Sequence, residues 1–191
     1  MSASSTSSPT VLIVPGLRDH VDAHWQTLLA AQLPQARTVP PMGRTGAGLD
    51  RAARVQAIEQ AAQAIEGPIV IVAHSGGCPM VAHWAAQTRR AVHGALLATP
   101  PELDQPMPEG YPPLEALQGG GWFPVPLRAL PFPSIVAASR NDPLARFAQV
   151  EQMARAWGSR LVDLGEVGHL NPASGHGPWP RALDFIAELS A

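Results

Sequence analysis

The stretch Ile69-Val70-Ile71-Val72-Ala73-His74-Ser75-Gly76-Gly77-Cys78-Pro79-Met80 is the most informative part of this 191-residue chain. The four β-branched or aliphatic residues that follow Gly67-Pro68 are typical of a short strand buried on both faces. After them come a polar pair, two glycines and an apolar run that favours a helix. A strand, a sharp turn of small residues and a helix form the layout of a nucleophile elbow, which strains the central serine and directs its hydroxyl out of the sheet.

The residues two before and two after the elbow serine must be small, because strand and helix pass close together there. They are Ala73 and Gly77. One alternative is a glycine-rich phosphate loop, but the stretch has neither Gly-Lys-Ser/Thr nor G-x-G-x-x-G. The other alternative is an ordinary strand-to-helix turn without chemistry.

Composition excludes several classes of function. The net charge is −2 and the 13 basic residues are scattered, which argues against a nucleic-acid footprint. The apolar runs are too short to span a bilayer, so no membrane role is expected. The sequence contains no lysine, which excludes Schiff-base chemistry, Ser-Lys dyads, lysine-bound pyridoxal phosphate and a Walker lysine. The single cysteine, Cys78, rules out a disulfide framework and favours a reducing cytoplasm.

The Ser-rich N-terminus lacks a basic region followed by an apolar core, so it is interpreted as a tail and not as a signal peptide. The expected organisation is a flexible tail over residues 1–9 and a single domain over residues 10–191. His20 and His24 have the i, i+4 spacing of metal ligands, but no third or fourth ligand stands beside them, so no metal site is predicted.

Apolar runs alternate with helical patterns along the chain. Asp22 is a candidate N-cap for the first helix, which would carry Trp25 on its apolar face. Strands alternating with helices predict a mostly parallel sheet of about six strands, with right-handed crossovers and helices on both faces. The expected strands cover 11–14, 36–39, 69–72, 92–98, 134–139 and 161–164; the later helices cover 49–65, 76–88, 144–157 and 180–189.

A proline-rich segment without periodicity, 99–133, interrupts this alternation. Long irregular segments are often binding loops, and this one leaves the sheet beside the strand that carries Ser75. We therefore expect Trp122 or Phe123, with Leu17 and Trp25 opposite, to wall a compact acyl pocket. The alternative is that these aromatic side chains only pack the segment against the domain.

A nucleophilic serine needs a base, and the base needs an acid that orients it. Asp142 follows the strand 134–139 and His169 follows the strand 161–164, so both should lie at the same sheet edge as Ser75. The chain order Ser, Asp, His is that of α/β-hydrolases. Alternatively, Asp142 only caps a turn and His169 is structural. Asp163 is a competing acid, but it lies within a strand.

Two backbone N–H groups are expected to stabilise the oxyanion. Gly76 directly follows the nucleophile at the start of a helix, and Leu17 follows the first strand after Pro15-Gly16. Cys78 lies one turn into the helix and is interpreted as a small packing residue.

Several motifs together resemble a known family, the small single-domain serine hydrolases of the retinoblastoma-binding protein nine type within the α/β-hydrolase superfamily. They are Pro15-Gly16 with Trp25 downstream, Ala-His-Ser-Gly-Gly at 73–77, Ser139 to Pro143, Gly168-His169-Leu170-Asn171, and Ser174-Gly175-His176-Gly177-Pro178-Trp179-Pro180. The resemblance extends from about residue 10 onward and implies an α/β-hydrolase-like three-layer sandwich. It also implies that Ser75, Asp142 and His169 are nucleophile, acid and base. Ala73 in place of glycine and Gly76 in place of a larger apolar residue depart from the family pattern without removing a reacting group.

The sequence therefore predicts a cytoplasmic, cofactor-independent serine hydrolase that cleaves small carboxylic esters, or secondarily amides, through an acyl-enzyme intermediate. The alternative is a protein-binding module with the same fold and little hydrolysis, although nothing in the sequence indicates a protein partner. A flavodoxin-like nucleotide-binding domain also fits the sheet pattern, but it would lack a phosphate loop.

Overall fold

A computed structural model describes residues 8–19 and 21–191 of the chain. Most of the expected N-terminal tail, residues 1–7, lies outside the described residues, as does His20. The strands and helices alternate along the chain in this order: β1 Thr10–Val14, α1 Trp25–Gln32, β2 Ala36–Thr38, the 3₁₀ helix η1 Gly46–Leu49, α2 Arg51–Gln63, β3 Ile69–His74, α3 Gly77–Ala85, β4 Gly94–Ala98, α4 Leu114–Gly119, β5 Ser134–Ala138, α5 Phe147–Trp157, β6 Arg160–Asp163, the 3₁₀ helix η2 Pro172–Ser174 and α6 Arg181–Ser190.

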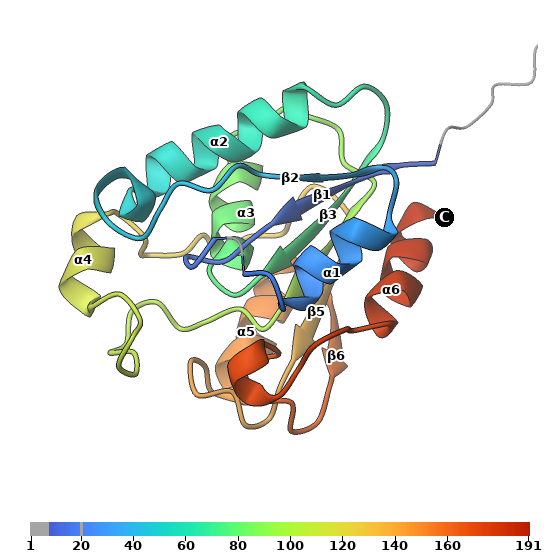
Figure 1. The fold of residues 1–191 in the computed structure, drawn as a ribbon. Helices are drawn as coiled ribbons and strands as arrows, with labels where there is room; N and C mark the ends of the chain where they lie inside the picture. The colour runs from blue at the N-terminus through green and yellow to red at the C-terminus, as the bar shows by residue number, and fades with distance from the viewer. Residues whose placement is uncertain (1–7, 20) are drawn as a thin grey trace, which may run out of the picture.

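The described strands form one six-stranded sheet in the order β2-β1-β3-β4-β5-β6, and every neighbouring pair is parallel (Figure 1). The prediction of a mostly parallel sheet of about six strands is confirmed. The strand β3 is buried along its whole length between β1 and β4, with Ala73 paired to Val14 on one side and to Leu97 on the other. Its carboxyl end, which leads into Ser75, therefore lies in the middle of the sheet edge.

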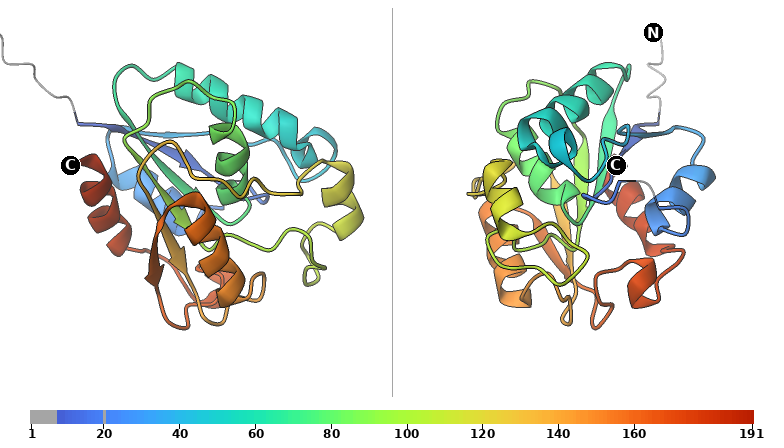
Figure 2. Two further views of the ribbon diagram at one scale, coloured as in Figure 1. Left: turned by 180° about the vertical axis from the view of Figure 1, so that it is seen from behind. Right: turned by 60° about the vertical axis from the view of Figure 1, so that its left-hand side comes forward.

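Helices cover both faces of the sheet and make three layers. In the right-hand view of Figure 2, α1 and α6 lie on one side of the strands, and α2, α3 and α5 lie on the other. Alternate residues of each strand point to opposite faces. In β3, Ile71 and Ala73 belong to the apolar cluster under α2, α3 and α5, whereas Val70 and Val72 belong to the cluster under α1 and α6. This double burial explains why the strands consist of near-continuous apolar runs.

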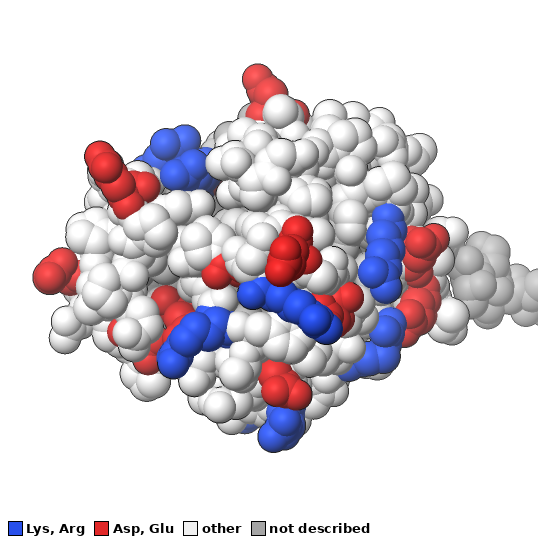
Figure 3. Space-filling model, turned by 90° about the horizontal axis from the view of Figure 1, so that it is seen from below, with Lys and Arg blue, Asp and Glu red and all other residues white. Residues whose placement is uncertain are grey.

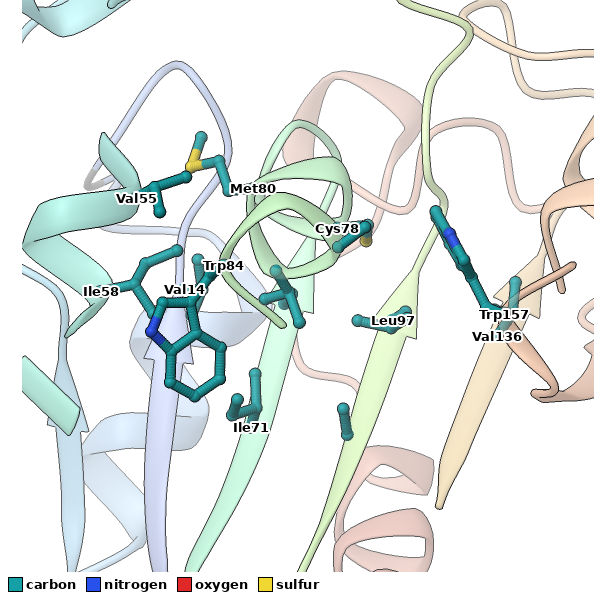
Figure 4. Packing of buried hydrophobic residues seen from close by; sticks show 14 of the residues in the cluster. Val14, Val55, Ile58, Ile71, Cys78, Met80, Trp84, Leu97, Val136 and Trp157 are labelled. Carbon is teal, nitrogen blue, oxygen red and sulfur yellow. The ribbon is translucent and has the colours of Figure 1, made fainter. Parts of the chain in front are cut away.

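The larger cluster fixes α3, the helix that follows the Ser75 turn, against the sheet (Figure 4). Trp84 is fully buried among Val14, Ile58 and Ile71, and its indole N–H donates to the Glu59 carboxylate. Cys78 lies near the carboxyl end of β4, where its thiol donates to the Ala98 carbonyl at 3.3 Å. The interpretation of Cys78 as a buried packing residue therefore agrees with the structure.

Two local expectations differ from the structure. The N-cap of α1 is His24, whose Nδ1 accepts from the Gln26 N–H, and not Asp22. Because the helix begins at Trp25, a cap at Asp22 would lie too far upstream to reach its first N–H groups. The irregular segment 99–133 also contains the short helix α4, which begins after Pro113, where the fixed φ of proline suits a helix start.

Surface charges are dispersed on the face shown in Figure 3, where most basic side chains lie singly and close to acidic ones. The surface ion pairs of the described chain include Arg140 with Asp163 and Arg146 with Glu102. Within the described part of the chain, no helix is long and apolar enough to cross a membrane.

The difference in burial between two leucines predicts different losses of stability on truncation. Leu97 is fully buried in β4, whereas Leu127 is 62% exposed. Replacing Leu97 by Ala should lower the free energy of unfolding by about 2–5 kcal/mol, because methyl groups are lost and a cavity remains. The same change at Leu127 should alter it by less than about 0.5 kcal/mol. Urea unfolding of both variants measures the difference, and equal effects would contradict the burial pattern.

Candidate active site

The loops at the carboxyl edge of the sheet bring three predicted residues into hydrogen-bond contact. Ser75 directly follows β3, Asp142 lies in the loop after β5, and His169 lies in the loop after β6. The Ser75 Oγ lies 2.8 Å from His169 Nε2, and the two carboxylate oxygens of Asp142 lie 3.0 and 2.9 Å from His169 Nδ1. Residues 94 positions apart thus form one continuous Ser–His–Asp line.

Ser75 has the strained backbone expected of the residue at the point of an elbow. Its φ is 55°, a left-handed value that is uncommon for residues other than glycine. The turn is held on both sides, since the Ser75 N–H donates to the Ala98 carbonyl and its own carbonyl accepts from the Cys78 N–H. A Cβ on Gly77 would lie 2.5 Å from the Val14 carbonyl oxygen, so only glycine lets α3 pass this close to the end of β1.

The acid and the base are almost completely removed from solvent. The side chains of His169 and Asp142 are 3% and 2% exposed. A carboxylate only accepts, so His169 Nδ1 carries the proton that it donates to Asp142, and in the neutral ring Nε2 is left to accept from the Ser75 hydroxyl. The competing acid, Asp163, pairs instead with Arg140 and accepts from the Gly165 N–H, far from this line of contacts.

Side chains of the β5 loop fix the loop that carries His169. The Asn141 amide oxygen accepts from the Gly168 N–H at 2.7 Å, and the Ser139 hydroxyl accepts from the Val167 N–H at 3.2 Å. His74 holds the same loop from the other side, because its Nε2 donates to the His169 carbonyl at 2.9 Å. A carbonyl can only accept, so this contact requires the Nε2–H tautomer of His74.

A row of three imidazole rings runs from α1 to the base. The ring centre of His74 lies 4.5 Å from that of His24 and 5.0 Å from that of His169. Burial, and then the nearby His169, lower the pKa of His24 to about 4. Burial in the first place, followed by the neighbouring histidines, lowers the pKa of His74 well below its usual range. At neutral pH both rings beside His169 are therefore uncharged.

The two predicted oxyanion donors lie next to each other above Ser75. A Cβ on Gly76 would lie 3.5 Å from the Leu17 backbone nitrogen and 2.9 Å from the Leu17 Cγ. The Leu17 side chain thus fills the space that a side chain at position 76 would occupy. Within the described chain, neither the Leu17 nor the Gly76 N–H donates to another group.

A pocket of about 560 Å³ opens onto Ser75 and His169. Its walls come from the loop after β1, the loop that precedes α2, and the first part of the segment 99–133. From that segment Leu103, Met107 and Tyr111 contribute the apolar surface. A larger hollow, of about 890 Å³, lies at the opposite edge of the sheet beside Pro68 and His93. It is remote from the Ser–His–Asp line.

Of the four residues expected to wall the pocket, only Leu17 lines it, and the three aromatic residues lie elsewhere. Trp122 is fully buried in the core under α2, α3 and α5, where its indole N–H donates to the Leu49 carbonyl, and Phe123 packs against the same cluster. Trp25 packs edge-to-face on Trp179 in the opposite cluster. Trp122 and Phe123 lie away from the pocket because the second half of the segment 99–133 turns back into the core, so that only its first half covers Ser75.

Sequence reasoning missed a buried ion pair at the wall of the pocket, to which Asp19 belongs. Asp19 and Arg54 contact each other at 2.5 Å, and their side chains are 10% and 5% exposed. The Asp19 carboxylate also accepts from the Met42 and Gly43 N–H groups, and Arg54 donates to the Gly43 and Gly48 carbonyls. An isolated arginine in a helix pattern carries no signal of such a contact. The role of His74 could have been suspected from its place directly before Ser75.

Two further chemistries are not supported at this site. Burial raises the pKa of the Cys78 thiol well above its usual range, which suppresses the nucleophilic thiolate. Over residues 8–19 and 21–191, no group of three His, Cys, Asp or Glu side chains is arranged to hold a metal ion. Of the pair His20 and His24, His20 lies outside the described residues.

The buried histidines predict a loss of stability in acid. The pKa of His24 is about 4 in the folded chain against about 6.5 when unfolded, so the unfolded state binds more protons as the pH falls through this window. His24→Asn keeps an oxygen that can cap α1 but removes this titration. The melting temperature of the variant should fall less than that of the wild type between about pH 7.5 and about pH 5. The control His93→Asn, at an exposed histidine, should keep the wild-type slope; an equal slope in both variants would contradict the assignment.

Comparison with solved structures agrees with this architecture. A YdeN-like hydrolase from Pectobacterium atrosepticum is 30% identical, with a TM-score of 0.81 over 96% of this chain and 91% of that chain. The ydeN gene product of Bacillus subtilis is 20% identical, with a TM-score of 0.75 over 95% and 98% of the two chains. Est1E from Butyrivibrio proteoclasticus, solved with ferulic acid, shares the fold at 13% identity and a TM-score of 0.70, over 97% and 91%.

No curated protein matches the chain in sequence. The family model described as "Serine hydrolase" matches residues 11–188, which include Ser75, Asp142, His169 and every strand but the first residue of β1. With this match over most of the chain, and with the α/β-hydrolase fold shared by its structural neighbours, the chain belongs to the serine hydrolase family.

Proposed function

We propose that this protein hydrolyses small carboxylic esters through a Ser75–His169–Asp142 triad and an acyl-enzyme intermediate. The observation that carries the proposal is the line of contacts from the Ser75 Oγ through His169 to Asp142, at 2.8 Å and 2.9 Å, on a serine with a φ of 55°. A buried serine used only for packing would need neither the strained turn nor a base oriented by a carboxylate.

In the first half of the reaction, the Ser75 Oγ forms a bond to the ester carbonyl carbon while His169 Nε2 takes the hydroxyl proton. The carbonyl electron pair moves onto its oxygen, and the Leu17 and Gly76 N–H groups donate to that oxyanion. When the tetrahedral intermediate collapses, His169 returns the proton to the leaving alkoxide and the alcohol departs. Asp142 holds the Nδ1–H tautomer and stabilises the imidazolium, without taking the proton itself.

In the second half, water replaces the alcohol. His169 removes a proton from the water as its oxygen attacks the acyl carbon, and then protonates the Ser75 Oγ as the acid leaves. The uncharged state of His24 and His74 supports this cycle, because no second positive charge then opposes the imidazolium of His169.

We also infer that the chain is of the retinoblastoma-binding protein nine type within its family. Support comes from the stretch Gly168-His169-Leu170-Asn171 with Ser174, in which Asn171 and Ser174 form a reciprocal capping box directly after the base. A pocket of about 560 Å³, walled by loops of the described chain, supports small esters as substrates, ahead of amides.

The nucleophile can be identified by chemical labelling. A fluorophosphonate probe at neutral pH should modify Ser75 alone, because among the described residues its hydroxyl is the one that contacts a general base at the pocket. Mass spectrometry of the labelled peptide locates the adduct, and Ser75→Ala is the control that should abolish it. Label on Cys78, or a native protein that is not labelled, would contradict the assignment and favour a binding module.

The two competing acids can be separated by matched amide substitutions. Asp142→Asn should lower kcat by as much as about four orders of magnitude, because the His169 tautomer is no longer fixed. Asp163→Asn removes the same charge at the surface and should change kcat by less than about two-fold. The measurement is the steady-state hydrolysis of a short acyl ester, with circular dichroism to show that both variants fold. The reverse order of effects would show that the acid is misassigned.

A further inference from the structure

Two arginines line the candidate active-site pocket without a carboxylate partner. Arg18 follows Leu17 in the loop after β1, and Arg44 lies in the loop that precedes α2. Both side chains belong to exposed residues, and in the part of the chain that the structure describes neither makes an ion pair. Among the described lining residues Asp19 carries the only carboxylate, and it is already taken by Arg54 and two backbone N–H groups.

Contacts to the opposite wall hold Arg18 over the pocket. Its Nη2 donates to the Gly110 carbonyl at 3.2 Å, and its guanidinium carbon lies 4.5 Å from the ring centre of Tyr111. That ring meets the His169 ring edge-to-face at 6.3 Å. The Tyr111 ring therefore lies between the Arg18 guanidinium and the His169 ring and contacts both. A guanidinium has five N–H donors, so the contact with Gly110 leaves donors free for an anion.

The buried Asp19–Arg54 pair ties the loops of these two arginines together. Asp19 directly follows Arg18, and its carboxylate accepts from the Gly43 N–H, which directly precedes Arg44. Arg54 donates to the Gly43 and Gly48 carbonyls on either side of Arg44. The pair neutralises itself, so it fixes the two loops without cancelling the positive charge that they present to the pocket.

We propose that the preferred substrates are esters that carry a carboxylate, which Arg18 and Arg44 bind while the ester carbonyl lies at Ser75. The inference deepens the proposed ester hydrolysis and rests on it. A carboxylate accepts charge-assisted hydrogen bonds from guanidinium groups, and a neutral ester of the same length leaves both charges without a partner. The pocket thus selects by charge as well as by size.

The first test compares kcat/KM for monoethyl succinate and ethyl butyrate, two esters with four-carbon acyl groups that differ in a terminal carboxylate. A second pair, 3-acetoxypropionate and propyl acetate, places the carboxylate on the alcohol side. The charged ester of at least one pair should be preferred by roughly ten-fold, and the preference should fall as the ionic strength rises. No preference in either pair would overturn the proposal.

Variants assign the preference to the two arginines. Arg18→Gln and Arg44→Gln should each lower the charged-to-neutral ratio of kcat/KM by roughly five-fold, whereas Arg18→Lys, which keeps the charge but loses the planar contact with Tyr111, should lower it by less. Arg128→Ala is the matched control, since Arg128 is also an exposed arginine that donates to a carbonyl, that of Ala86. It should leave the ratio and both rates unchanged. A charged-to-neutral ratio of kcat/KM that stays unchanged in both Gln variants would show that the two arginines do not bind the substrate carboxylate.

A binding measurement separates this inference from the proposed function. Ser75→Ala protein removes the nucleophile but keeps the pocket, and ligand-observed NMR then reports binding of monoethyl succinate and ethyl butyrate without turnover. Tighter binding of the half-ester, weakened by Arg18→Gln in the same background, supports the anion site even if the native protein proves inactive. Equal binding of the two esters by a protein that is active when native would overturn the anion site and leave the hydrolase function standing.

Discussion

The close approach of α3 to the end of β1 is the constraint on which the site depends. It exists because Gly77 has no side chain, and even one carbon atom there would stand 2.5 Å from the Val14 carbonyl oxygen. The approach sharpens the turn between β3 and α3, and the sharp turn places Ser75 at a positive φ with its hydroxyl facing His169. Burial of Trp84 and Cys78 on the sheet side of α3 keeps the helix in this position.

Most of the fold was predictable, because the inner strands β1, β3, β4 and β5 are apolar runs short enough to be distinguished from helices. Asp142 and His169 were predictable as neighbours of Ser75 for a topological reason, since parallel strands deliver the loops that follow them to the same edge. The predictions that failed concern details that tertiary packing decides. The cap of α1 depends on where the helix begins, and the position of Trp122 depends on how the segment 99–133 folds back into the core.

Charge is distributed unevenly between the two sides of the site. Behind the base, burial keeps His24 and His74 neutral, and the Asp142 carboxylate accepts from His169. In front of it, Arg18 and Arg44 are exposed and have no acidic partner in the described chain. The buried Asp19–Arg54 pair fixes the loops that carry Arg18 and Arg44 and adds no net charge, and its attraction is offset by the cost of desolvation.

The segment that covers Ser75, the first half of residues 99–133, is attached to the rest of the domain along its length. At its start, the Glu102 N–H donates to the Leu144 carbonyl, and the Glu102 carboxylate accepts from Arg146. In its middle, Arg18 donates to the Gly110 carbonyl. Further along, the indole N–H of the buried Trp122 donates to the Leu49 carbonyl. Lifting this segment away from Ser75 would break these contacts, whereas the pocket already reaches Ser75 and His169 with the segment in place. The protein should therefore behave as an enzyme of dissolved substrates, with no interfacial activation when an ester begins to form droplets.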